Sequence, residues 1–147
     1  MKVEQTILPG VLIITPDVFG DARGFFIETF RTSRYQEIGI KETFVQDNHS
    51  RSARGVLRGL HFQKAHPQGK LLSVSHGSVF DVAADINPAS PTFGKHVAIE
   101  LSDENHLQLY IPPSYAHGFC VLSEFADFHY KCTDFYVAND QHGILWN

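Results

Sequence analysis

The stretch LRGLHFQKAHPQGK, residues 57–70, concentrates cationic and titratable side chains in a segment whose other residues predict strand, turn, strand. Arg58, His61 and Lys70 are the residues in it that could do chemistry. A histidine exchanges a proton close to neutral pH, and arginine and lysine bind anions. A lone histidine in a strand is commonly structural. One placed beside these cations, with Gln46 and Asn48 in a neighbouring segment, favours a ligand site.

The pleat of the expected strand constrains that site. Regular alternation places Gly59 and His61 on one face and Arg58 on the other. Arg58 and His61 can face the same interior only if the strand is bulged, and glycine tolerates a bulge best. We therefore expect a bulge at Gly59, with Lys70 joining the two side chains from the next strand.

A second polar pattern lies in SVFDVAADI, residues 78–86. Alternation gives one face of Val79, Asp81, Ala83 and Asp85, and another of Phe80, Val82, Ala84 and Ile86. We expect the second, wholly apolar face to be the core. The first face, acidic and small, is typical of a barrel interior that holds a polar ligand, and equally of a solvated outer face.

The elements that must position these residues are short and rich in β-branched and aromatic side chains. Strands are expected at 11–14, 24–29, 44–50, 56–62, 70–75, 78–86, 96–101, 108–111, 118–122 and 126–133. One helix is expected at 32–38, with Thr32 or Ser33 as its N-cap and Gly39 at its end. Without repeats or linkers, residues 1–147 predict a single all-β domain, an antiparallel sandwich or barrel.

The composition excludes two classes of binding partner, nucleic acids and membranes. A net charge of −4 gives no general surface for nucleic acid. No apolar run approaches the roughly 20 residues that span a bilayer, and the first ten residues, MKVEQTILPG, lack a signal-peptide pattern. We expect a cytoplasmic protein that binds neither nucleic acid nor membrane.

The segment IPPSYAHGFCVL could present His117 as one metal ligand from a proline-fixed turn. A zinc or iron site needs three or four ligands at set spacing. LHFQ supplies one histidine and a glutamine, and Cys120 and Cys132 lack metal-site spacing. We expect no bound metal.

Longer motifs add a resemblance. The segments VFGDARGFFIETF, FVQDNHSRSARGVLRGLHFQ, GKL, VFDVAADI, SPTFGK, AHGF, YKCTDFY and GILW follow the order and near-spacing of one family. The chain resembles the dTDP-4-dehydrorhamnose 3,5-epimerases from about Val3 to Trp146. The resemblance implies a metal-free, cofactor-free cupin-type jelly-roll barrel. It also implies a homodimer acting on dTDP-4-keto-6-deoxy-glucose in rhamnose biosynthesis.

The same resemblance implies roles in catalysis. Inversion at carbons 3 and 5, both alpha to the ketone, needs a base on one face, an acid on the other and a group that holds the enolate oxygen. His61 matches the base, Tyr130 the acid and Lys70 the cation beside the oxyanion. Asp81 is expected to pair with Lys70.

Substrate contacts are implied in the same way. Those to the phosphates and sugar match Gln46, Asn48, Arg58 and His117, and Tyr136 matches an aromatic that stacks on the thymine. Arg23 and Glu28 match nucleotide contacts that the family supplies from the partner subunit. Gln141 stands where the family usually has an acidic contact.

The sequence leaves two questions open: which residue orients His61, and which of several related functions the protein has. The family carries, beyond the tryptophan, an aspartate that orients the catalytic histidine. Residues 1–147 contain no counterpart, so we expect a truncated form, another acid near His61, or weak activity. The alternatives to the double epimerase are a carbon-3-only epimerase or related deoxysugar isomerase, a non-catalytic sugar-nucleotide binder, and a metal-dependent cupin oxygenase.

Overall fold

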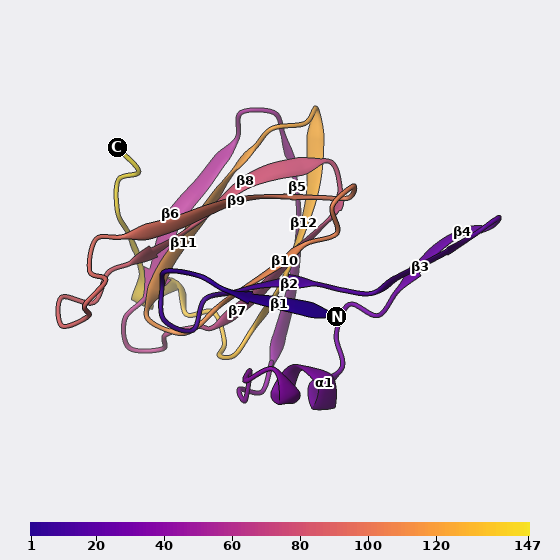
Figure 1. Ribbon diagram of the computed structural model, residues 1–147. Helices are drawn as coiled ribbons and strands as arrows, with labels where there is room; N and C mark the ends of the chain where they lie inside the picture. The colour runs from indigo at the N-terminus through magenta and orange to yellow at the C-terminus, as the bar shows by residue number, and fades with distance from the viewer.

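The computed structural model describes residues 1–147 and consists of two antiparallel sheets that face each other (Figure 1). The six-stranded sheet has the order β1 (Lys2–Gln5), β2 (Leu12–Thr15), β10 (Gln108–Ile111), β7 (Lys70–His76), β12 (Phe125–Cys132), β5 (Gln46–Ala53). The five-stranded sheet has the order β13 (Gln141–Gly143), β6 (Leu57–Gln63), β11 (Tyr115–Val121), β8 (Ser78–Asp85), β9 (His96–Ser102). The all-β prediction is confirmed.

A separate hairpin of β3 (Val18–Asp21) and β4 (Gly24–Ile27) projects away from both sheets (Figure 1). Its strands carry exposed aromatic side chains: Phe19, Phe25 and Phe26 are 62%, 64% and 68% exposed. The strands β1, β3 and β13 were not expected from the sequence, because each is short and lies at a sheet edge or in the hairpin.

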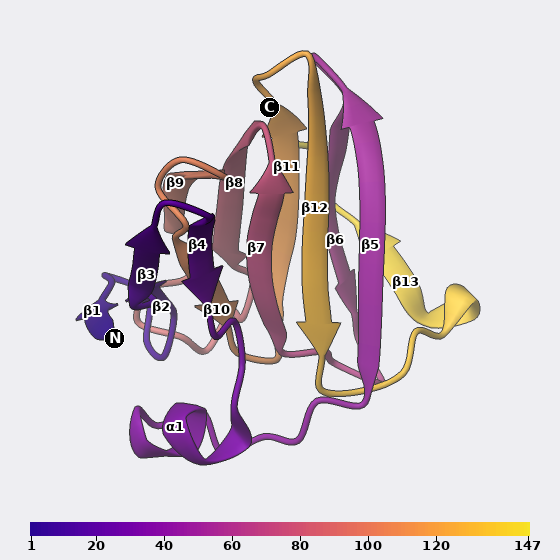
Figure 2. The ribbon, with the colours of Figure 1, turned by 90° about the vertical axis from the view of Figure 1, so that its right-hand side faces the viewer.

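The single α-helix, α1 (Thr32–Glu37), lies at one end of the sheets (Figure 2), and a 3₁₀ turn, η1 (Ala138–Asp140), precedes β13. The expected helix is confirmed, but its expected cap is wrong. The N-cap is Arg31, in an extended conformation with no side-chain cap bond, so neither Thr32 nor Ser33 caps the helix. Gly39 ends it at φ +100°, as expected. No helix is long and apolar enough to cross a membrane.

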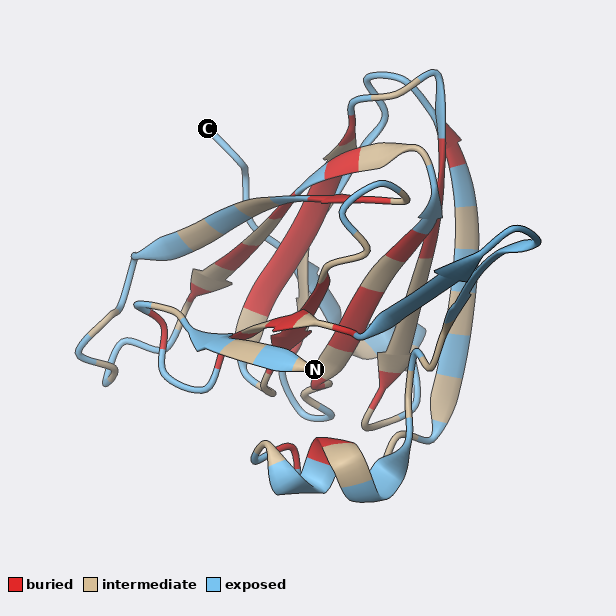
Figure 3. Ribbon diagram, turned by 45° about the vertical axis from the view of Figure 1, so that its right-hand side comes forward, coloured by how far each residue is buried: buried red, intermediate tan, exposed pale blue.

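The core lies between the two sheets, where buried positions cover the inner faces of the strands (Figure 3). Leu72 and Phe128 from one sheet pack in the same cluster as Val79 and Leu101 from the other. A second cluster brings Tyr35 of α1 together with residues of β2, β7 and β10. The alternation of each strand therefore decides which side chains can reach the space between the sheets.

The strand β8 corrects the prediction made from SVFDVAADI. Val79, Asp81 and Ala83 are fully buried, whereas Phe80, on the supposed core face, is 46% exposed. The acidic face is the interior of the barrel and the apolar face is the outer side of the sheet. The apolar face of β8 was wrongly predicted to be the core face, because the interior of this barrel also surrounds a polar cavity. Such an interior tolerates a carboxylate that an ordinary apolar core would exclude.

A bulge at Gly59 confirms the expectation for β6. In the pairing with β11, His117 lies opposite His61 but Phe119 lies opposite Arg58, so β6 contains one extra residue. Gly59 has φ +127°, and a Cβ added there would lie 2.5 Å from Cα of Gly118. A Cβ on Gly118 would lie 2.7 Å from the carbonyl oxygen of Arg58. The two backbones approach so closely that only glycine fits on both sides.

We predict that Gly59→Ala lowers the free energy of unfolding by about 3 kcal/mol, because the new methyl group meets backbone atoms as well as an unfavourable φ. Gly39→Ala is the matched control: its φ is also positive, but a Cβ there has no neighbour within 4 Å. It should cost about 1 kcal/mol. Denaturant unfolding of both variants measures the difference, and equal losses would contradict the close backbone contact.

Candidate active site

A cavity of about 400 Å³ lies between the sheets and gathers most of the residues singled out in the sequence. Of the predicted site residues it is lined by Gln46, Asn48, Arg58, His61, Lys70, His117, Tyr130, Tyr136 and Gln141. Sequence reasoning missed four further lining residues: Ser50, Gln68, Phe119 and Phe128. Ser50 follows Gln46 and Asn48 at the period of a strand, so alternation along β5 could have identified it.

The two sheets contribute different groups to this cavity. His61 and His117 lie directly opposite each other on β6 and β11 of the five-stranded sheet. Lys70 and Tyr130 come from β7 and β12 of the six-stranded sheet. A ligand between the sheets would therefore have His61 on one side and Tyr130 on the other.

The surroundings of His61 favour its neutral form. Partial burial lowers its pKa, and the positive charges of Lys70 and His117 lower it further. An imidazole with a pKa below its usual 6.5 is uncharged at neutral pH and can accept a proton. No carboxylate is hydrogen-bonded to the His61 ring within residues 1–147, so the expected replacement acid is not found there.

Lys70 and Tyr130, on the facing sheet, differ from His61 in the groups that they present. Burial lowers the pKa of Lys70, and the side chain forms no ion pair with a protein group. Its amino group is therefore not neutralised by a protein carboxylate and lines the cavity. Burial raises the pKa of Tyr130 above 10, so the phenol stays protonated and can donate.

Asp81 has a different partner from the one expected. Its Oδ2 lies 2.9 Å from Nε2 of His117, and no ion pair joins it to Lys70. Asp81 is fully buried behind His117 rather than at the cavity wall, and its Oδ1 has no hydrogen-bond partner. The contact fixes the His117 ring, which donates from Nε2 to the carboxylate or shares an ion pair with it.

Hydrogen bonds between side chains also order the polar wall formed by β5. Gln46 Nε2 donates to Asn48 Oδ1 at 3.0 Å, and Arg58 Nε donates to Ser52 Oγ at 3.0 Å. These contacts hold the amide groups and the guanidinium in place without neutralising the arginine, because Ser52 is uncharged. Arg58 therefore keeps a full positive charge for an anion in the cavity.

Arg23 and Glu28 do not reach this cavity. Arg23 is at the tip of the β3–β4 hairpin and pairs with Asp21 at 2.5 Å. Glu28 follows the hairpin and pairs with Arg34 at 3.0 Å. The structure thus separates both residues from the cavity of their own chain.

The donor atoms of the chain form no group of three or more His, Cys, Asp or Glu side chains suited to a metal ion. The cavity instead combines a proton acceptor, a proton donor and unpaired cations. Together with two facing antiparallel sheets, these features define an acid–base enzyme built on a cupin-type jelly-roll barrel.

The chain belongs to the dTDP-4-dehydrorhamnose 3,5-epimerase family, which it matches over residues 5–147. It is 55% identical to the dTDP-4-dehydrorhamnose 3,5-epimerase of Shigella flexneri, over all of this chain and 82% of that protein. The chain therefore spans about four fifths of that relative's length.

Solved structures agree in fold. A Legionella pneumophila epimerase crystallised with dTDP-4-keto-L-rhamnose is 53% identical, with a TM-score of 0.97 over 99% of this chain and 78% of that one. A Bacillus anthracis dTDP-4-dehydrorhamnose 3,5-epimerase with TDP and PPi bound is 41% identical, with a TM-score of 0.95 over 99% and 85%. The predicted family and jelly-roll fold are confirmed.

We predict that His61 titrates below 6.5 and that Lys70→Met raises its pKa, because one of the two neighbouring positive charges is removed. The pKa should still remain below 6.5, since burial is the largest cause of the shift. NMR titration of the His61 ring measures both values. Lys95→Met, on the exposed surface, is the control and should leave the pKa unchanged. A pKa unaltered by Lys70→Met would mean that the two groups do not interact.

Proposed function

We propose that this protein epimerises dTDP-4-keto-6-deoxy-glucose at carbons 3 and 5 to dTDP-4-keto-rhamnose, in deoxysugar biosynthesis. The observation that carries the proposal is the position of His61 and Tyr130 on opposite walls of one cavity. A centre is inverted when a proton leaves one face of the carbon and returns to the other. A base and an acid from facing sheets supply that geometry.

The reaction follows from the state of each group. Neutral His61 takes the proton from a carbon alpha to the ketone, and the electron pair moves into the carbonyl to give an enolate. Lys70 stabilises the enolate oxygen, a contribution of roughly 3 kcal/mol in comparable sites. Tyr130 then donates its proton to the opposite face of the carbon, the carbonyl reforms, and solvent restores both side chains.

The rest of the cavity fits the nucleotide diphosphate. Arg58 supplies positive charge for the phosphates, His117 makes a further contact to them, and the amides of Gln46 and Asn48 contact the sugar. Tyr136, 51% exposed at the cavity, offers its ring for stacking on the thymine. Gln141 takes part as a neutral contact where relatives carry an acid. Asp81 contributes indirectly, by holding His117.

The proposal includes a homodimer in which the hairpin of one subunit completes the site of the other. The exposed Phe19 and Phe26 lie opposite each other on one face of the hairpin and the exposed Phe25 lies on the other, so a single subunit leaves apolar area on both faces in water. Arg23 and Glu28 lie on or beside that hairpin and outside their own cavity. Both observations support a role for these residues across a subunit interface.

We predict that His61→Asn reduces turnover by about 10² to 10⁴, the usual contribution of a general base, while dTDP binding is retained. The assay measures conversion of dTDP-4-keto-6-deoxy-glucose in heavy water by the variant and by the unaltered protein. For the unaltered protein, the positions of incorporated deuterium are located by NMR. Deuterium at both carbons supports the 3,5-epimerase, and deuterium at carbon 3 alone identifies the single epimerase. No incorporation together with tight dTDP binding would leave only a binding protein.

The variant Tyr130→Phe should separate proton exchange from inversion. It removes the donor but keeps His61, so abstraction and return of a proton on the same face can continue. Deuterium should therefore enter the substrate faster than product forms. Equal loss of exchange and inversion would show that Tyr130 does not act after deprotonation.

Mixed dimers test the role of Arg23. One preparation carries Arg23→Ala and another His61→Asn; they are unfolded, mixed equally and refolded. If Arg23 acts across the interface, each mixed dimer has one site with both defects and one with neither. Random pairing then returns about one site in four to full activity. If Arg23 serves its own chain, every site keeps a defect and confirmed mixed dimers recover no activity.

A further inference from the structure

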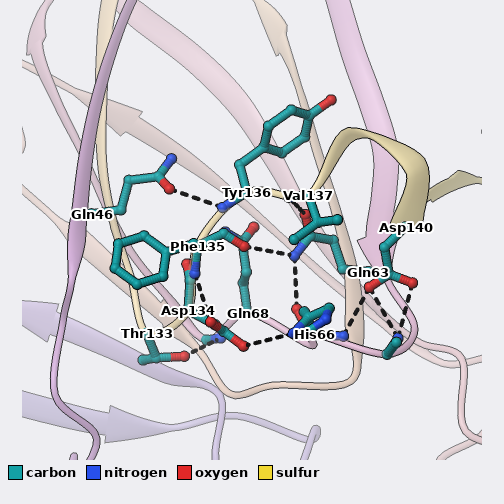
Figure 4. Close-up of polar contacts among 12 residues, drawn as sticks. Gln46, Gln63, His66, Gln68, Thr133, Asp134, Phe135, Tyr136, Val137 and Asp140 are labelled. Carbon is teal, nitrogen blue, oxygen red and sulfur yellow. Dashed lines mark hydrogen bonds and ion pairs between the residues drawn. The ribbon is translucent and has the colours of Figure 1, made fainter.

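Two loops border the cavity on the side where Tyr136 lies (Figure 4). One, residues 64–69, joins β6 to β7, and the other, residues 133–137, leads from β12 to η1. Both loops contribute lining residues, Gln68 and Tyr136. Such irregular segments hold a side chain in one place only if their backbone groups are bonded to something fixed.

Gln63, the last residue of β6, bonds both loops. Its Nε2 donates to the carbonyl oxygen of His66 at 2.7 Å and to that of Phe135 at 3.1 Å. Its Oε1 accepts from the backbone N–H of Val137 at 2.7 Å (Figure 4). Gln63 is 6% exposed, so its amide has little access to water and would be left without partners if these backbone bonds were lost.

The Gln63 contacts fall on either side of Tyr136. Gln63 holds the carbonyl of Phe135 and the N–H of Val137, and Gln46 Oε1 accepts the N–H of Tyr136 itself at 2.9 Å. Three consecutive residues are thereby fixed through their backbones while the Tyr136 ring stays half-exposed. A ring held in this way avoids the ordering cost that a mobile one incurs on binding a ligand.

Other contacts tie the loops together farther from Tyr136. Gln68 Nε2 donates to the carbonyl of Asp134 at 2.8 Å. The Asp140 carboxylate accepts from the backbone N–H groups of Ala65 and His66, at 2.8 to 3.0 Å, and these bonds lower its pKa (Figure 4). Since they do not bond the residues adjoining Tyr136, they stabilise the loops without replacing Gln63.

We propose that Gln63 is a positioning residue, which holds Tyr136 as a preformed platform for the nucleotide base and so sets the affinity for dTDP. This inference rests on the proposed function, because that function supplies the nucleotide. An amide is the group required, since the position uses two donors and one acceptor at once. A glutamate would keep the acceptor but direct negative charge at two carbonyl oxygens, and a methionine would keep the volume without any hydrogen bond.

The test is calorimetric binding of dTDP and of inorganic pyrophosphate to Gln63→Met, Gln63→Glu and the unaltered protein. Gln36→Met, an exposed glutamine on α1, is the matched control. Both Gln63 variants should bind dTDP about tenfold more weakly and pyrophosphate unchanged, because the base is the part of the ligand that contacts Tyr136. In turnover, KM should rise while kcat is largely retained, since His61, Lys70 and Tyr130 lie on strands.

A double substitution shows whether Gln63 acts through Tyr136. Gln63→Met added to Tyr136→Ala should weaken dTDP binding no further than Tyr136→Ala alone. Additive losses, or full dTDP affinity in folded Gln63→Met, would overturn the inference and leave the proposed function intact. If the unaltered protein binds dTDP but catalyses no exchange, the proposed function fails and the positioning role stands. If it binds no dTDP, both fail.

Hydrogen exchange of the unaltered protein gives a reading that does not depend on how the variants fold. The N–H groups of Tyr136 and Val137 should be protected in the absence of ligand, because Gln46 and Gln63 accept them. Exchange at the rate of an unstructured peptide would show that the platform is not preformed and would overturn the inference.

Discussion

The close approach of two backbones at Gly59 and Gly118 is the constraint on which the cavity depends. It leaves no room for a Cβ on either strand and shifts the register of β6 against β11 by one residue. The shift places Arg58 and His61 at the same cavity, although regular pleating would send them to opposite faces. Without it, His61 and Arg58 would not line the same cavity.

The two facing sheets present different functional groups to the cavity. The five-stranded sheet presents the histidines, and the six-stranded sheet presents Lys70 and Tyr130. Burial lowers the pKa of His61 and raises that of Tyr130, which favours a neutral imidazole and a protonated phenol. One buried carboxylate, Asp81, is placed against His117, so neither Lys70 nor Arg58 forms an ion pair with it.

Hydrogen bonds between side chains and backbone groups hold the loops at the border of the cavity. The strands position His61, Lys70 and Tyr130, and side-chain amides bond the backbones of the loops. Gln63 is an example, because its bonds to Phe135 and Val137 link the end of β6 to residues more than 70 positions later in the chain. The part of the cavity around Tyr136 therefore depends on contacts between residues distant in sequence, as the part built on strands does.

The sequence by itself determined the all-β class, the position of the helix and most strands, since these follow from local alternation and turn residues. It also indicated the bulge at Gly59 and, through long motifs, the family. Only the tertiary structure decided which face of β8 is interior, because a carboxylate such as Asp81 can be buried once a histidine from another strand bonds it. It likewise decided that Asp81 pairs with His117 and that Gln63 secures Tyr136. Those contacts join residues distant in sequence, and no local pattern records them.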